Sequence, residues 1–189
     1  LVSDKLDFPN LSMVGVDDRA AAYQAVSYLI QQGHRKIAVL GGPATSYPSM
    51  MRRQGAQQAM EDAGIRFEDK LYGLSNYDFE SAYHAMNGLL ARRAEFTALF
   101  AMSDVIAFGA IRALVSAGLQ VPEDVSVIGF DGITMSRYCV PVMTTIVQPS
   151  EQIALQSIEL LVRQIEHGAP AQTVTLQPEL QQGESVRAI

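Results

Sequence analysis

The chain has 189 residues, of which 48% are hydrophobic, and this is enough for one or two α/β domains with a real core. Lysine and arginine number 14 against 20 acidic residues, which gives a net charge of −6. Because a surface that binds DNA through its phosphates is basic, we expect this chain not to contact DNA itself. The sequence has no apolar run long enough to cross a bilayer, so no membrane partner is expected. The single cysteine, Cys139, excludes an internal disulfide and fits a cytoplasmic location.

The first two thirds of the chain alternate short apolar runs with amphipathic stretches, as β/α units do. The apolar runs predict strands at 13–16, 37–40, 71–74, 98–101 and 125–130. Helices are predicted between them, with Gly33, Gly64 and Gly118 as the glycines that end a helix. Since parallel strands are joined by right-handed crossovers through helices, the sequence predicts an α/β fold with a parallel sheet covered on both faces.

The pattern changes after residue 141. A strand is predicted at 144–147, and Ser150 is expected to cap the long helix that follows it. Five apolar side chains of this helix are predicted to point inward: Ala154, Ile158, Leu161, Val162 and Ile165. The segment 173–176 alternates as a half-exposed edge strand does.

Two parts of the chain hold too few elements to fold alone. We therefore assign residues 1–34 and 144–169 to a partial N-terminal lobe, and 35–143 and 170–189 to a C-terminal lobe. Domains between which the chain crosses several times typically close on a ligand by hinge motion.

One predicted strand ends on a carboxylate, Asp131, and ligands of open α/β sheets bind outside the carboxyl ends of the strands. The strand lies in Val121-Pro-Glu-Asp-Val-Ser-Val-Ile-Gly-Phe-Asp131, and Pro141-Val-Met-Thr-Thr-Ile-Val-Gln-Pro149 follows it. Together the two segments resemble the effector-binding core of the LacI/GalR (lactose-repressor and galactose-repressor) family of bacterial transcription regulators. Further segments match this core in order and spacing: Val16-Asp17-Asp18, 28–43, Arg52-x-x-Gly55, 97–104 and Ala107-x-Gly109-Ala110.

The resemblance implies a type I periplasmic-binding-protein-like fold of two lobes, with a small effector between them. It also implies a homodimer that reads operator DNA through an N-terminal helix-turn-helix, which this sequence does not contain. The effector expected for the family is a small polar metabolite, with a sugar or sugar derivative as the first choice and a purine or another metabolite as the alternative. No cofactor and no enzymatic activity are expected, and the N-terminal lobe is expected to be incomplete.

Three residues are the main candidates for the effector site. The resemblance makes Arg52 the arginine of the cleft, where its planar guanidinium suits paired oxygens; the alternative is a solvated helix arginine. Asp131 would accept hydrogen bonds from vicinal hydroxyls, or else bind nearby backbone N–H groups. Tyr77 would stack on the C–H face of a sugar, and an ordinary loop tyrosine is the equal alternative.

Three further residues are weaker candidates. Ser103 stands where sugar-binding members often have Asn before an Asp, and it keeps one hydrogen bond at most. Ser103 or Asp104 is expected to cap the helix that follows, and Asp104 is interpreted as a cap rather than as a ligand contact. Ser46 and Tyr47 lie in the variable loop before the predicted helix at 49–63 and would contribute to the site.

The resemblance also suggests a dimer interface. It involves Phe108 and, in the loop 135–140, Tyr138, Cys139 and Val140. The alternative for Phe108 is local core packing.

Two other functions remain open from the sequence. One is a periplasmic sugar-binding receptor of a transport system, which shares the fold. The other is an enzyme, but no nucleophile with a base, no metal-ligand cluster and no phosphate-binding glycine motif is recognisable. His34 is interpreted as a structural residue near the crossing between lobes.

Overall fold

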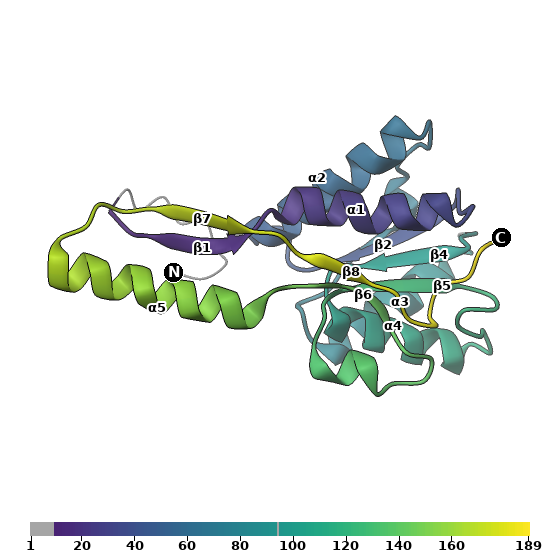
Figure 1. The fold of residues 1–189 in the computed structure, drawn as a ribbon. Coiled ribbons are helices and arrows are strands. Elements are labelled where there is room, and N and C mark those ends of the chain that lie inside the picture. The colour runs from purple at the N-terminus through teal and green to yellow at the C-terminus, as the bar shows by residue number, and fades with distance from the viewer. Residues whose placement is uncertain (1–9, 94) are drawn as a thin grey trace.

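The computed structural model describes residues 10–93 and 95–189, and its larger unit is built on a six-stranded sheet with the order β3-β2-β4-β5-β6-β8 (Figure 1). The strands are β2 (Ile37–Gly41), β3 (Tyr72–Leu74), β4 (Ala98–Ala101), β5 (Ser126–Asp131), β6 (Thr144–Val147) and β8 (Glu179–Gln181). Neighbouring strands pair in parallel, except that β8 runs antiparallel to β6. The predicted parallel sheet is thereby confirmed.

Four helices cover the two faces of this sheet. They are α1 (Asp18–Gln31), α2 (Tyr47–Asp62), α3 (Phe79–Ala91) and α4 (Asp104–Ser116). Helices α1 and α2 pack together on one face, and α3 and α4 pack together on the other (Figure 1). Because both faces are covered, every residue of β2 and β4 is buried, which explains why these strands are continuous apolar runs rather than alternating ones. Two short 3-10 helices, η1 (Asp69–Leu71) and η2 (Thr134–Arg137), lie in the connections.

In the described part of the chain the smaller unit consists of two strands and one helix, and it projects from the larger unit (Figure 1). Strand β1 (Met13–Val16) pairs in parallel with β7 (Thr173–Leu176), and α5 (Ser150–His167) packs against them. Its core is a separate cluster of three buried residues, Val14, Ile153 and Leu160. The chain passes between the two units after β1, after β6 and after β7.

The inward stripe predicted for α5 is wrong. Ala154, Ile158, Leu161, Val162 and Ile165 are all exposed, and Ile165 is 74% exposed. The buried residues of α5 are instead Ile153 and Leu160, which stand seven residues apart on one line of the helix. A sheet of two strands is too narrow to cover more of the helix than this line. The predicted cap is also one residue off, because Pro149 is the N-cap and Ser150 is the first helical residue.

The lobe boundaries predicted from the sequence differ from this packing. Helix α1 lies within 1–34 but contributes Val26 and Leu29 to the core of the larger unit, and β6 pairs with β5 in the larger sheet. Strand β7 lies within 170–189 but pairs with β1 in the smaller unit. The physical reason is that strand pairing and helix packing, both non-local, decide these memberships. Residues 1–9 of the predicted N-terminal lobe lie outside the described residues.

The ends of the parallel strands determine where a ligand site forms. Strands β2, β4, β5 and β6 run in the same direction, so the residues that follow them gather at one edge of the sheet. This edge faces the smaller unit in Figure 1. Across the described part of the chain, no helix combines the length and the apolar character that a membrane span requires.

Candidate functional site

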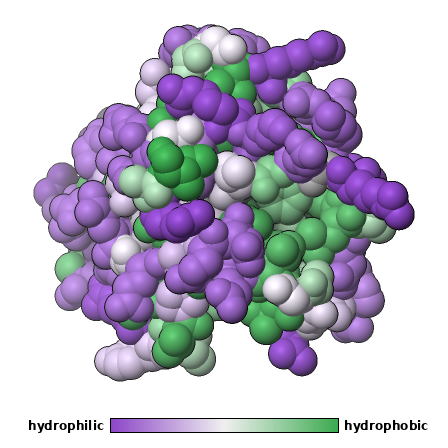
Figure 2. All heavy atoms as spheres, turned by 90° about the vertical axis from the view of Figure 1, so that its right-hand side faces the viewer, coloured by the Kyte–Doolittle hydropathy of each residue, from purple (hydrophilic) through white to green (hydrophobic). Residues whose placement is uncertain are grey.

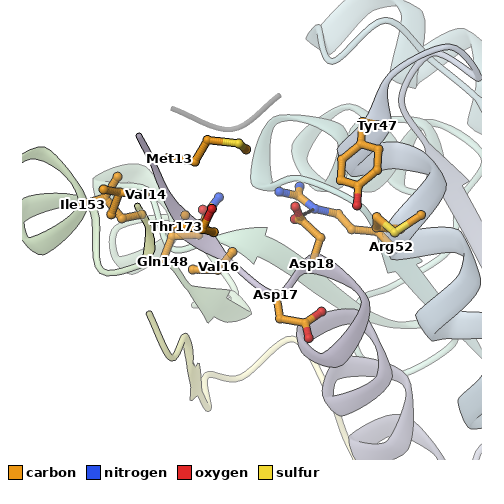
Figure 3. Close-up of a pocket in the computed structure, with 12 residues that line it drawn as sticks. Met13, Val14, Val16, Asp17, Asp18, Tyr47, Arg52, Gln148, Ile153 and Thr173 are labelled. Atoms are coloured by element: carbon orange, nitrogen blue, oxygen red, sulfur yellow. Dashed lines mark hydrogen bonds and ion pairs between the residues drawn. The ribbon is translucent and has the colours of Figure 1, made fainter. Parts of the chain in front are cut away.

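A cavity of about 280 Å³ lies between the smaller unit and the carboxyl edge of the larger sheet (Figure 3). Residues of both units form its wall. It is lined by Met13, Val14, Gly15, Val16, Asp17, Asp18, Tyr47, Met51, Arg52, Gln148, Ile153 and Thr173. The two units are joined by connecting segments of the chain, and both contribute to this wall. The cavity is therefore suited to a ligand that both units contact.

Arg52 is the central polar residue of this wall. It comes from α2 and is only 6% exposed. Its Nε donates to Oδ1 of Asp18 at 2.7 Å, one of its terminal nitrogens donates to the carbonyl of Met102, and that nitrogen lies 3.7 Å from Oδ1 of Asp131. The guanidinium also stacks 3.7 Å above the ring of Phe130. These contacts hold the guanidinium in one orientation, and the alternative of a solvated arginine does not apply.

Asp131 lies at the end of β5, directly behind Arg52. Its Oδ1 accepts a hydrogen bond from Nε2 of Gln148 at 2.7 Å, and its φ of 113° turns the chain sharply at the strand end. Burial raises the pKa of the Asp131 carboxyl, and the Arg52 guanidinium opposes this effect. Arg52 and Asp131, both predicted to contact the effector, are therefore neighbours. Arg52 and Gln148 line the cavity, whereas Asp131 stands one layer behind them.

Asp104 forms a second layer behind Asp131. Its side chain is fully buried and accepts hydrogen bonds from the Thr145 hydroxyl at 2.6 Å and from the Ile133 N–H at 2.8 Å. Burial raises the pKa of its carboxyl to about 6. Position 129 must be glycine for this packing, because a Cβ there would come within 2.3 Å of Oδ1 of Asp104. Asp104 thus connects β6 with the backbone that follows Asp131.

Of the two caps expected, Ser103 and Asp104, the structure uses Ser103. The Ser103 hydroxyl accepts from the Ile106 N–H at 3.2 Å, and Ser103 is the N-cap of α4. Both residues are buried, and neither is among the cavity's lining residues in the described chain. Ser103 therefore caps α4 in this structure, and the neighbouring carboxylate of Asp104 accepts a hydrogen bond from the loop after β5.

Of the remaining predicted ligand contacts, one lines the cavity and two do not among the described residues. Tyr47 lines the cavity and lies near Arg52 in Figure 3. Ser46, which precedes α2, and Tyr77 are not among the described lining residues. The ring of Tyr77 lies so close to Gly42 that a Cβ there would be 2.1 Å from it. Its hydroxyl is buried and has no hydrogen-bond partner among the described residues.

Sequence reasoning missed several lining residues. An acid at the start of a helix is ordinarily interpreted as a cap, and here the capping oxygen belongs to Asp17, which accepts from the Ala20 N–H at 2.9 Å, whereas Asp18 pairs with Arg52. Gln148 lies inside the segment that carries the family resemblance, so this segment was the available signal for it. Met13 and Thr173 reach the cavity because β1 pairs with β7, and no local pattern indicates that pairing.

The predicted interface residues lie on the surface of the larger unit. Tyr138 and Val140 are exposed, Val140 by 94%. Cys139 is half-buried, and Phe108 packs against the core. An apolar groove beside them is lined by Phe79, Phe108, Ile111, Arg112, Val115, Met135 and Cys139. Figure 2 shows the face of the larger unit that lies away from α5, where apolar side chains gather in the lower part.

His34 is buried at the junction of three segments. Its Nδ1 lies 2.9 Å from the Thr97 hydroxyl and its Nε2 lies 3.1 Å from the carbonyl of Arg187. A carbonyl only accepts, so Nε2 carries the proton and Nδ1 accepts from Thr97. Burial lowers the pKa of His34. These contacts are structural, and none of the three residues is among the described lining residues of the cavity.

The fold and its cavity define a ligand-binding α/β core of the periplasmic-binding-protein-like class. Residues 26–186 match the family model of the periplasmic binding protein-like domain. The HTH-type transcriptional regulator MalR of Clostridium butyricum is 38% identical over 92% of this chain and 52% of its own length. The repressor PurR of Histophilus somni is 35% identical over 95% of this chain and 54% of its own length. A solved complex of the transcriptional regulator CelR with cellobiose is 32% identical and has a TM-score of 0.92, covering 97% of this chain and 57% of that one.

The chain belongs to the LacI/GalR family of transcriptional regulators and forms part of an effector-binding core. Other matching structures are described as LacI-family regulators. The chain spans about half the length of the curated relatives it matches. These relatives are regulators rather than enzymes, in agreement with the prediction from the sequence.

Proposed function

We propose that this chain is the effector-sensing core of a bacterial repressor and that the cavity beside Arg52 binds a sugar or sugar derivative. The observation that carries this proposal is the buried guanidinium of Arg52, fixed by Asp18 and Asp131 at the wall of the cavity. A buried charged group whose orientation is fixed at the wall of a cavity is suited to binding a ligand there.

The chemistry of the wall supports a sugar-like ligand. Arg52 and Gln148 supply N–H donors, and Asp18 supplies acceptor oxygens. Tyr47, Met13 and other apolar side chains supply surfaces for the C–H groups of a sugar ring. The volume of about 280 Å³ is near the lower end of the range of roughly 300–1,000 Å³ for ligand pockets, so a small ligand is favoured. The cellobiose complex of CelR adds support from a relative.

The same geometry suggests how binding could control DNA. A ligand that contacts both β1 and α2 stabilises one placement of the smaller unit against the larger one. Regulation then requires that this placement differ in free energy between the DNA-competent and DNA-incompetent states. The operator would be bound by a helix-turn-helix outside this chain, in a cytoplasmic homodimer whose interface includes Phe108, Tyr138, Cys139 and Val140. The alternative of a periplasmic transport receptor is not favoured, because the relatives are regulators.

Calorimetric titration of the purified protein with neutral mono- and disaccharides tests the proposal. We expect at least one sugar to bind, and we expect Arg52→Lys, which keeps the charge but loses the planar fork, to weaken it by about tenfold or more. Arg53→Lys is the matched control, because Arg53 is the neighbouring arginine and contacts Phe67 and Tyr72 outside the cavity. Equal binding by the two variants, or no sugar binding by the wild-type protein at millimolar concentrations, would count against the proposal.

A further inference from the structure

The contact between Asp18 and Arg52 places a carboxylate where an anionic ligand would have to bind. Nε of Arg52 already donates to Asp18 at 2.7 Å, and the side chains are only 8% and 12% exposed for Arg52 and Asp18. A terminal nitrogen of Arg52 is shared between the carbonyl of Met102 and, at 3.7 Å, the carboxylate of Asp131. The positive charge of the guanidinium is thus compensated by protein groups before any ligand enters.

The charges that the described residues place around the cavity are unbalanced toward the acidic side. Among its described lining residues Arg52 is the cation, and Asp17 and Asp18 are the acids. Asp131 adds a further carboxylate behind Arg52. In Figure 3 the carboxylate of Asp18 meets the guanidinium, while the carboxylate of Asp17 points away from it. A phosphate or carboxylate that entered would meet more negative than positive charge in a partly buried site, where such repulsion is screened weakly.

An uncharged polyhydroxylated molecule meets no such repulsion. Its hydroxyl groups can donate to the carboxylate of Asp18 and accept from the free N–H groups of Arg52. Two neighbouring hydroxyls of one ligand can therefore form hydrogen bonds with both the acidic and the basic member of the ion pair. Rejecting a competitor through a misplaced charge is a common source of specificity.

We propose that Asp18 is the residue that determines ligand charge at this site. Through its contact with Arg52 it makes the cavity a receptor for a neutral polyol and excludes the phosphate esters and carboxylates of the same sugars. This inference rests on the proposed function, and it specifies the class of ligand within it.

Matched pairs of ligands test the inference without any variant. The wild-type protein is titrated at low ionic strength with glucose and glucose 6-phosphate, and with ribose and ribose 5-phosphate, next to the neutral sugars of the panel above. We expect that a neutral sugar binds and that a phosphate ester binds at least tenfold more weakly than its neutral partner or not at all.

A second measurement uses inorganic phosphate as the probe. We expect Asp18→Asn to bind phosphate at least tenfold more tightly than the wild-type protein, because Arg52 is then free to pair with it. Asp69→Asn is the matched control: it removes the carboxylate from the exposed Arg53–Asp69 pair, outside the cavity, and should leave phosphate binding unchanged. Circular dichroism verifies that each variant is folded. If Asp18→Asn does not fold, the titrations of the wild-type protein with the matched ligand pairs test the inference by themselves.

The outcomes separate this inference from the proposed function. Binding of a phosphate ester as tightly as its neutral partner would overturn the inference and leave the sensor function standing. So would equal phosphate affinities of folded Asp18→Asn and wild-type protein. If no sugar of either charge binds the wild-type protein, the proposed function fails, and the ligand class assigned here fails with it.

Discussion

Asp104 carries a buried carboxyl group with a raised pKa. Burial raises its pKa from the ordinary value of 3.8 to about 6 in the folded chain. As the pH falls through 6 the folded protein takes up a proton at Asp104, while the unfolded chain does so only near 3.8. The contribution of Asp104 to stability therefore increases on acidification between about pH 6 and pH 4, and it is lost as the pH rises through 6.

The variant Asp104→Asn tests this assignment. Asparagine keeps the size of the side chain and one acceptor oxygen, but it does not titrate. We expect the stability of the wild-type protein relative to the variant to increase by about 2 kcal/mol between pH 7 and pH 4.5. Urea unfolding across this range measures the difference, in which the opposing effect of the buried His34 cancels. Parallel pH profiles for the two proteins would contradict the raised pKa.

Sequence reasoning found part of the site at the residue scale. Arg52 and Asp131 were both predicted to contact the effector; their charged groups lie 3.7 Å apart, and of the two only Arg52 is among the described lining residues of the cavity. Asp18 was not recognised as the partner of Arg52, because an acid at the start of a helix is more simply interpreted as a cap. Tyr77 was proposed to stack on the ligand, but no pattern in the sequence reveals that its ring packs on Gly42. A residue's type and its place in an element can be predicted, but the direction of its side chain depends on neighbours far away in the chain.

At the scale of elements, α5 is held by few contacts. Leu160 is 8% exposed and belongs to the small cluster with Val14 and Ile153, whereas the next residue, Leu161, is 54% exposed. Because this cluster is separate from the main core, it provides an independent measure of how the smaller unit is attached.

Adjacent leucines give a matched pair of variants on this helix. We expect Leu160→Ala to lower the free energy of opening α5 by about 2 kcal/mol or more, since it removes a buried side chain. Leu161→Ala should change that free energy by less than about 0.5 kcal/mol. Hydrogen exchange of the α5 amides followed by mass spectrometry measures both. Equal effects of the two substitutions would show that the helix packs differently from this structure.

The elements themselves were largely predictable. Strands 13–16, 98–101 and 144–147 were predicted with the bounds of β1, β4 and β6, because short apolar runs between helix caps and glycines are strong local signals. The inward face of α5 was not predictable, since periodicity identifies an amphipathic helix but not the surface that covers it. The same limit applies to the pairing of β1 with β7, which are distant in the sequence. The Gln172–Ser12 hydrogen bond beside this pair spans 160 positions.

At the scale of the whole molecule, the chain joins two units through three connections and places a cavity between them. The larger unit contributes Arg52 and Tyr47, and the smaller unit contributes Met13, Ile153 and Thr173. A ligand in this position would couple the two units, and such coupling is what an effector-controlled regulator needs. The parallel sheet covered on both faces was predictable from the order of β/α units, and the two-lobed fold was implied by the family resemblance. Membership of the two units depends on non-local pairing.

The central claim is that a neutral sugar binds between these units against the Arg52–Asp18 pair. A crystal structure of the protein grown with the tightest-binding sugar of the titration panel tests it most directly. The account predicts a sugar in the cavity, with hydroxyl groups within about 3.2 Å of the Arg52 guanidinium and of the Asp18 carboxylate. A sugar bound elsewhere on the protein, with neither Arg52 nor Asp18 in contact with it, would contradict the account.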